Sequence, residues 1–434
     1  MKRIEVVSYP SDPISPKIEK ILNRKLDVLG DVEVAVREIL DSVRSEGDRA
    51  VAEFATRFDG VEFVESGYKV AVSELTSALN DLDPNLRLAI EEAIENVRNF
   101  HNHQGKNSWF VEDGDGVILG KKITPIDRVG ICVPAGKAPL FSSLIMCAVP
   151  AQIAGVKEIC VVSPPRTNGC VDPVIAATAR LLGIEEIHAV GGAQAVAAMA
   201  YGTESIRRVD KIVGPGSPYT VAAQKQVFGL VGIPMLPGPS EIVVLADEGA
   251  DPSHVAADML SQAEHGWGVA SVCITTSSKL GNEVNAELSK QLAELSDNGD
   301  TARALEEFGA IVIVDELDHG IELMNRLAPE HAELLVTNPW EWIDKVRHCG
   351  ALFLGSHSTE PVGDYFAGTN HVLPTNGAAR YASSLGVADF LKDTSIISYS
   401  EKRLKKAGSE ISRMARAEGL EAHARAVEIR GEKS

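Results

Sequence analysis

The sequence lacks both a hydrophobic run long enough to cross a membrane and the apolar core of a signal peptide. Its longest mainly apolar stretch, residues 143–156, is interrupted by Pro150 and Gln152, whereas a transmembrane helix needs about 20 consecutive apolar residues. The first residues, MKRIEVVSYPSDP, contain no apolar segment of the secretory type. These absences favour a cytoplasmic protein with no membrane partner.

Positive charge is scarce relative to negative charge. The chain has 42 Lys and Arg against 61 Asp and Glu, for a net charge of −19. A surface of this kind repels the phosphates of nucleic acids and of anionic lipids. Nucleic acid is therefore excluded as an expected partner, whereas a small-molecule substrate is not, because a local site decides its binding.

Several common cofactor motifs are also absent. None of the six cysteines forms a C-x-x-C pair, and no H-E-x-x-H occurs, so a metal site would need ligands from distant segments. No G-x-G-x-x-G follows a predicted strand, but the glycine pair at 191–195 (GGAQA) opens a helix whose N–H groups could hold phosphate. A tight strand-to-helix turn is the alternative. Cys132 lies in a loop-like stretch, GICVPAGKAP, that could line a ligand site.

The chain does contain a repeated alternation of short β-rich runs and helical stretches, beginning near residue 117. This alternation predicts an α/β fold with parallel sheets and helices on their faces. Four glycine-rich turns are expected to follow strands, at the carboxyl ends where such sheets bind ligands. Its length of 434 residues allows two or three domains.

The segments outside the alternation are predicted to be helical. Residues 33–58 and 76–102 have apolar residues three or four apart, and the tail at 401–430 indicates one helix with charges of both signs. We expect the two early helices to pack with the α/β unit at 241–385. The predicted division is an N-terminal arm (1–30), a first α/β domain (31–131 plus 241–385), a second α/β domain (132–240) and a C-terminal tail (386–434).

The stretch RLAPEHAEL places an acid beside an imidazole, at Glu330 and His331. Pro329 ends the preceding helix near Leu327, and Glu330 is expected at the positively polarised start of the next element. A carboxylate beside a histidine is predicted to raise the histidine pKa toward neutrality, which suits repeated proton transfer. The alternative is a helix start with two polar caps.

The helix around residues 253–265 carries an unusual polar pair. Ser253 is predicted as its N-cap, and Gln262 falls on the apolar face with Val255 and Met259. His265, three residues further on, could join Gln262 in binding one metal ion. A buried, hydrogen-bonded glutamine and an exposed histidine near the helix end are the alternative.

Two further segments hold candidate polar residues. Asp364 and His371 lie in an ordered loop, EPVGDYFAGTNHVLPT, where turn capping is an equally good interpretation. Glu418 and His423 lie in the predicted tail helix. Because five residues of helix correspond to about 140° of rotation, these two are not expected to share one face closely.

Taken together, these segments resemble the histidinol dehydrogenase family. The stretches LSQAEHG, NRLAPEHAEL, GDYFAGTNHVLPT and AEGLEAHARAVEIR occur in the same order and at similar separations as in that family, over residues 30–430. The resemblance implies two incomplete Rossmann-like domains in a domain-swapped homodimer, with one zinc ion per subunit and NAD. The first domain would carry most of the metal and acid–base site, the second would bind the nucleotide, and the tail would reach the partner subunit.

The resemblance also implies roles for single residues. Glu330 and His331 would perform acid–base catalysis. The zinc ligands would be Gln262, His265 and Asp364, with His423 supplied by the other subunit. Substrate contacts would come from Ser240, Gln262, His265, His331, Asp364, His371, Glu418 and His423. NAD contacts would come from Gln194, from Cys132 where the family usually has tyrosine, and from Ser217 where it usually has asparagine.

The function implied is an NAD-dependent, four-electron oxidation of L-histidinol to L-histidine through L-histidinal, the last steps of histidine biosynthesis. One alternative is a paralogue that oxidises another primary alcohol to its acid, such as a sulfopropanediol dehydrogenase. Another is a binding or regulatory protein descended from the enzyme. Retention of every proposed ligand and proton-handling residue counts against the latter.

Overall fold

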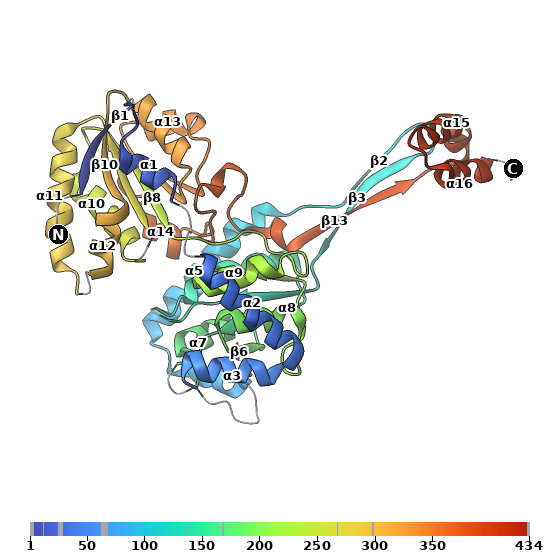
Figure 1. The fold of residues 1–434 in the computed structure, drawn as a ribbon, viewed down its shortest axis with the longest axis horizontal. Coiled ribbons are helices and arrows are strands. Elements are labelled where there is room, and N and C mark those ends of the chain that lie inside the picture. The colour runs from blue at the N-terminus through green and yellow to red at the C-terminus, as the bar shows by residue number, and fades with distance from the viewer. Residues whose placement is uncertain are drawn as a thin grey trace.

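The computed structural model describes residues 4–11, 13–24, 29–61, 68–136, 138–166, 169–266, 268–296 and 299–431. Within them the chain forms a six-stranded, a four-stranded and a three-stranded sheet. Figure 1 shows two α/β units side by side and a long arm that carries the last helices away from both. The α/β class and the parallel sheets predicted from the strand–helix alternation are confirmed.

The six-stranded sheet has the strand order β1-β10-β9-β8-β11-β12, and every neighbouring pair is parallel. Separate hydrophobic clusters line its two faces, so helices cover both. β1 comes from the segment predicted as an N-terminal arm, and it pairs with β10 as an edge strand of this sheet. The strands are β1 (Glu5–Tyr9), β8 (Glu241–Ala246), β9 (Ala270–Thr275), β10 (Gly309–Val314), β11 (His331–Leu335) and β12 (Ala351–Leu354), and the helices are α1 (Pro16–Leu22), α10 (Pro252–Ala263), α11 (Ser278–Glu294), α12 (Gly299–Phe308) and α13 (Leu317–Leu327).

The four-stranded sheet has the order β6-β5-β4-β7 and is also parallel throughout. Its strands are β4 (Arg128–Cys132), β5 (Glu158–Ser163), β6 (Ile187–Ala189) and β7 (Lys211–Val213). The connecting helices are α6 (Phe141–Ala154), α7 (Pro173–Leu181), α8 (Gly192–Tyr201) and α9 (Pro218–Val227).

The early helices belong to the four-stranded unit. One hydrophobic cluster joins Val36 to Val196 and Ala222, so α2 packs on α8 and α9, while α4 packs on α7 and α5 on α6. The grouping of residues 31–131 with 241–385 is therefore wrong for these helices, because their apolar faces complete the other core. The helices are α2 (Leu29–Glu46), α3 (Asp48–Asp59), α4 (Val72–Asp81) and α5 (Pro84–His101).

Local breaks divide both predicted early helices. The helix predicted at 33–58 is interrupted at Gly47, whose φ of 57° favours glycine and ends α2. The helix predicted at 76–102 is interrupted where Asp83 caps α5 and Pro84 occupies its first turn. In both places the period of apolar residues continues across the break, so periodicity alone did not reveal it.

The three-stranded sheet forms the arm seen in Figure 1. Its order is β13-β3-β2, with antiparallel pairing, and it leads to two helices at the C-terminal end. The single tail helix predicted at 401–430 is in fact two, because Gly419, with φ of 76°, turns the chain between them. The elements are β2 (Trp109–Glu112), β3 (Ile118–Pro125), β13 (Leu391–Ser398), α15 (Glu401–Ala417) and α16 (Glu421–Gly431).

Short helical turns complete the fold: α14 (Glu360–Tyr365), η1 (Asn102–Gln104), η2 (Pro339–Lys345), η3 (Ala378–Arg380) and η4 (Val387–Phe390). The N-cap of α10 is Asp251, which accepts the Ser253 backbone N–H over 2.8 Å, so the prediction of Ser253 as the cap is wrong. Among the described residues, no helix combines the length and apolarity that a membrane crossing requires.

Candidate active site

A group of buried titratable side chains lies where β8 and β11 begin. His331 is the first residue of β11 and is 3% exposed. Its Nδ1–H donates to the backbone carbonyl of Glu241 over 3.2 Å, and its Nε2 has no protein partner. The Oε2 of Glu330 accepts the Glu241 backbone N–H over 3.1 Å and lies 3.7 Å from His331 Nδ1. The strand pairing thus presents the free Nε2 of a neutral imidazole inside the site.

The charge states of this pair differ from the prediction. Burial lowers the pKa of His331 to about 3, so its ring is neutral. Burial, together with the carboxylates of Glu241 and Asp364, raises the pKa of Glu330 well above its usual value. The predicted imidazolium is wrong, because a protonated carboxyl has no charge with which to stabilise it. The element after Pro329 is a strand, so no helix dipole acts on Glu330 either.

Three residues predicted to bind a metal lie on α14 and at the end of α10, which the hydrogen bond from the Ser261 hydroxyl to Glu360 joins over 3.1 Å. Asp364 lies on α14, with its Oδ1 3.9 Å from His331 Nε2. Gln262 lies in the last turn of α10, is fully buried, and has no hydrogen-bond partner for either amide atom. His265 follows α10, and its Nδ1–H donates to the Gln262 carbonyl over 3.2 Å. Its contribution to the pKa shifts of His331 and Glu360 places it beside the same cluster.

This donor set fits a divalent cation. His331, Glu360 and Asp364 each offer one ligand atom, and these atoms lie within 4.8 Å of one another. Burial raises the pKa of both carboxyls, and the nearby Asp364 raises that of Glu360 further. A bound cation would offset this charge repulsion. It would also satisfy the amide oxygen of Gln262, since burying an amide without a partner costs about 1–3 kcal/mol.

Ser240 and His371 join the same site. Ser240 immediately precedes β8 and hydrogen-bonds to Glu330 through its side chain. The Nδ1–H of His371 donates to the Asp364 carbonyl over 2.9 Å, and its Nε2 lies 3.1 Å from the hydroxyl of Ser143 on α6. Burial lowers the pKa of His371 to about 4. His371 therefore lies at the junction of the two α/β units.

Glu418 and His423 are not brought to this site within one chain. Both lie in the helical pair at the far end of the arm (Figure 1), where they line an open hollow of about 800 Å³. The turn at Gly419 separates them, so the 140° expected for one continuous helix does not apply. Met414, which lines the same hollow, is 69% exposed, and Leu420 is 42% exposed. The hollow is thus an apolar, uncovered surface with two polar groups in it.

The residues predicted to contact NAD gather at the carboxyl end of the four-stranded sheet. Cys132 and Ser217 line a cavity of about 140 Å³, and Gln194 and Ser217 line an adjoining cavity of about 370 Å³. Gly192, with φ of 67°, starts α8 between them, so the N–H groups at this helix end are close to both cavities. Ser217 caps α9 by accepting the backbone N–H of Thr220. Burial raises the pKa of the Cys132 thiol to about 12, so it is not a nucleophile here.

The two units therefore use opposite ends of their strands. Three of the glycine-rich turns follow strands of the four-stranded sheet, as predicted. The fourth, at residues 236–241, precedes β8, so the prediction is wrong there. The site of the six-stranded unit lies at the amino end of β8 because α10 runs back along that strand and brings Gln262 to this end.

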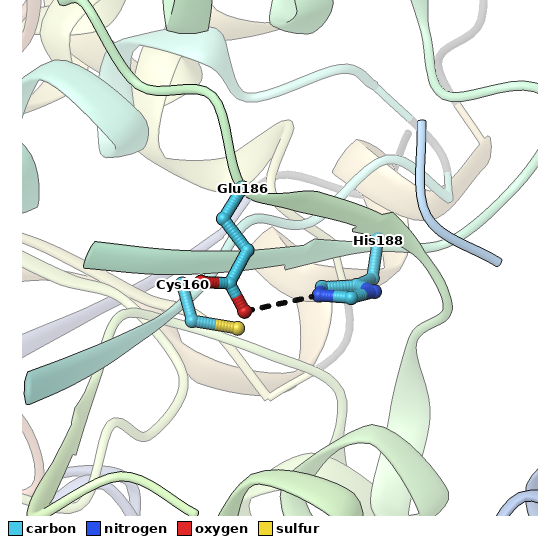
Figure 2. Close-up of side chains that lie close together, drawn as sticks. All are labelled: Cys160, Glu186 and His188. Carbon is cyan, nitrogen blue, oxygen red and sulfur yellow. Dashed lines mark hydrogen bonds and ion pairs between the residues drawn. The ribbon is translucent and has the colours of Figure 1, made fainter. Parts of the chain in front are cut away.

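A second cluster of possible ligands lies in the four-stranded unit, where Figure 2 shows Cys160, Glu186 and His188 together. The Nε2–H of His188 donates to Glu186 over 3.3 Å, and Arg128 donates to the same carboxylate at 2.8 Å and through a second, shorter contact. Arg128 already supplies the positive charge, so the cluster is a buried ion-pair network rather than a metal site. It lies at the starts of β4 and β6, away from the cavities at the carboxyl end.

Sequence reasoning missed three residues of these sites. Glu241 is the first residue of an otherwise apolar strand, and that mismatch was the available signal. Glu360 is four residues before Asp364, the spacing that puts two side chains on one helical face. Asp59 lines the larger cavity beside Gln194, and its Oδ2 is buried without a partner. No local pattern singles out Asp59.

The fold and the two sites define an α/β enzyme. One unit holds a buried proton acceptor beside a cation-binding donor set, and the other holds glycine-lined cavities at a helix N-terminus. The sequence model of histidinol dehydrogenase matches residues 22–431, so the chain belongs to the histidinol dehydrogenase family of oxidoreductases.

Individual relatives agree with this assignment. The chain is 49% identical over 410 residues to histidinol dehydrogenase of Halalkalibacterium halodurans, covering 94% of this chain and 96% of the relative. It is 47% identical to the Bacillus subtilis enzyme, covering 91% and 92% of the two chains. The crystal structure of histidinol dehydrogenase from Elizabethkingia anophelis superposes with a TM-score of 0.92 at 35% identity, covering 98% of each chain.

Proposed function

We propose that this chain oxidises L-histidinol to L-histidine through L-histidinal, using NAD and a zinc ion, in the last steps of histidine biosynthesis. The observation that carries the proposal is the neutral, buried His331, whose Nε2 has no protein partner and faces Asp364. This is a base placed where a substrate hydroxyl can reach it, in a chain from a family of known oxidoreductases.

The first oxidation needs removal of one proton and one hydride from the alcohol. His331 Nε2 takes the hydroxyl proton while the Glu241 carbonyl holds Nδ1–H and so fixes the ring. NAD, when bound, accepts the hydride. Burial keeps His331 neutral and therefore ready to accept a proton without first losing one.

The second oxidation needs water to add to the aldehyde. Glu330, once ionised, is the residue we assign to accept the water proton, with the Glu241 N–H holding its carboxyl group. Its raised pKa makes it a stronger base once ionised. The hydrate would then give up a second hydride, which NAD would accept, and become the acid. A buried site also keeps the aldehyde from reacting elsewhere.

Gln262, His265 and Asp364 are the residues of this chain that would hold zinc. Oxygen and imidazole nitrogen are ligands that zinc accepts, and Gln262 otherwise has no partner. Zinc would supply a template that anchors the nitrogen atoms of the substrate. Glu360 lies close enough to influence the same cation.

The cavities at the end of the four-stranded sheet suit NAD. Gln194 and the N-terminus of α8 offer donors to a pyrophosphate. Asp59 lines the same cavity, and its Oδ2 is buried without a hydrogen-bond partner. A carboxylate there accepts ribose hydroxyls and repels a 2′-phosphate, which favours NAD over NADP. Cys132 and Ser217 complete the lining.

The proposed dimer is domain-swapped through the arm. Apolar side chains remain exposed along it, including Phe110 at 57% and Ile397 at 72%, as expected of a surface that a second chain covers. In this arrangement Glu418 binds substrate and His423 completes the zinc ligands of the neighbouring subunit. His371 is the remaining substrate contact.

The test is NADH production from histidinol and from a panel of other primary alcohols. We expect two NADH per histidinol, loss of activity with a chelator, and recovery with zinc. Activity confined to another alcohol would reject histidinol and favour the alternative of a paralogue that oxidises another primary alcohol. No NADH from any alcohol would reject the oxidoreductase assignment of these residues.

A further inference from the structure

A buried ion pair lies directly behind the acid–base residues. Arg24, just after α1, donates through one guanidinium nitrogen to Glu241 Oε1, and the same nitrogen lies 3.3 Å from Asn376 Oδ1. The side chains of Arg24 and Glu241 are only 7% and 10% exposed. Arg24 also stacks over Phe308, 5.8 Å from its ring centre. The guanidinium is thus held by polar contacts on one side and an aromatic ring on the other.

Glu241 connects this ion pair to both members of the catalytic pair. Its backbone carbonyl accepts the His331 Nδ1–H, and its backbone N–H donates to Glu330 Oε2. Its carboxylate Oε2 accepts the Glu330 backbone N–H over 3.3 Å, and its Oε1 accepts the Asn376 N–H over 2.8 Å. One residue therefore fixes the backbone and side chain of Glu330 and the ring of His331.

The two carboxyl groups cannot keep this arrangement without a cation. The side chains of Glu241 and Glu330 are both buried, and each carboxyl group accepts the backbone N–H of the other residue, so the two carboxyl groups lie close together. Arg24 lies in direct contact with Glu241, and Arg380 contributes from further away. Removal of Arg24 would leave the Glu241 carboxylate buried without its charged partner, which favours movement of the side chain or uptake of a proton. Either change would disturb the bonds to Glu330 and His331.

The segment that carries Arg24 is firmly attached to the same unit. Ile18 and Ile21 of α1 are buried in the core on one face of the six-stranded sheet, and β1 pairs with β10. We propose that Arg24 is a positioning residue for catalysis, which aims Glu330 and His331 through its ion pair with Glu241. The inference rests on the proposed function and extends it to a residue outside the catalytic site.

The test compares Arg24→Ala and Arg24→Lys with a control on α1, the helix just before Arg24, namely Lys17→Ala. Lys17 donates hydrogen bonds to the carbonyls of Glu306 and Glu307 over 3.0 and 3.2 Å and does not contact the site. Its loss therefore weakens the attachment of this segment without changing the contacts of Glu241. We expect Arg24→Ala to lower kcat for histidinol about 100-fold, the effect of a small misplacement of reacting groups. Bound zinc and the KM for NAD should stay within about twofold of wild type.

Guanidinium provides the second measurement. Added guanidinium ion should restore kcat of Arg24→Ala at least about tenfold, and methylammonium should not, because only the planar ion contacts Glu241 and Asn376 together. If Arg24→Ala does not fold, Arg24→Lys carries the test, with an expected loss of about tenfold in kcat.

Three outcomes would overturn the positioning role. They are a wild-type kcat in a folded Arg24 variant, equal rescue of Arg24→Ala by both ions, and a loss of kcat in Lys17→Ala equal to that in Arg24→Ala. A wild-type enzyme that is inactive on histidinol would instead reject the proposed function, before any variant is compared.

Discussion

Gln262 offers the sharpest test of the metal site, because its buried side chain lowers the stability of the fold when no ligand is bound. Both amide atoms are buried and neither has a partner. Replacement by leucine, of similar size, removes both unsatisfied atoms. Since an unpaired buried amide costs about 1–3 kcal/mol, metal-free Gln262→Leu should be more stable than metal-free wild type by about that amount.

The assay is denaturant unfolding of chelator-treated protein, with and without zinc. At zinc 100-fold above its Kd, the wild type should gain about 2.7 kcal/mol of stability, and Gln262→Leu should gain far less. Gln224→Leu is the matched control, because Gln224 is 1% exposed but donates to the Gly214 carbonyl over 3.2 Å. That variant should be destabilised and should still respond to zinc. A Gln262→Leu protein that is less stable without metal, or gains as much from zinc as wild type, would refute the reasoning.

Three further outcomes are expected. Mixing His423→Ala with His265→Ala chains should restore part of the activity through hybrid dimers; no recovery in confirmed hybrids would contradict shared sites. Asp59→Asn should bind NADP more tightly relative to NAD, measured by calorimetry, and an unchanged ratio would remove Asp59 from the ribose site. Burial raises the pKa of Glu186, but His188 and Arg128 outweigh it and hold that pKa below its usual value. Glu186→Gln should therefore destabilise the fold by about 1.5–3 kcal/mol at pH 7. The difference measured by denaturant unfolding should begin to shrink below about pH 4, where the unfolded chain takes up the proton, and should keep shrinking as the pH falls toward the depressed pKa of the folded state.

Much of the fold could be predicted because it depends on local patterns. Buried parallel strands are short apolar runs between glycine-rich turns, and each run in the alternation proved to be a strand. The side on which α2 packs could not be predicted, because its apolar face fits any sheet and long-range contacts decide the choice. The arm strands β2, β3 and β13 were missed since they are largely exposed and have no clear alternation.

Residues of the candidate site could be predicted where their type was unusual for their position in the sequence. Gln262 on an apolar face was an anomaly in the sequence, and its unsatisfied amide explains it. The pKa of His331 was predicted in the wrong direction, because a neighbour in sequence indicates a charge but not its burial. Glu241 and Arg24 are 217 residues apart in the chain, so no local spacing could connect them.

The arm has a consequence for how a defect in this protein would be inherited. In the proposed dimer, the tail helices of each chain serve the reaction centre of its neighbour. A cell that makes both intact and tail-deficient chains would then assemble some dimers with one chain of each kind. In such a dimer the site on the intact chain lacks the tail helices of its partner. The site on the deficient chain receives the tail helices of the intact chain. Total activity would depend on how often intact and deficient chains pair. Strong dilution would inactivate even intact chains, because it separates each site from the tail helices of its partner.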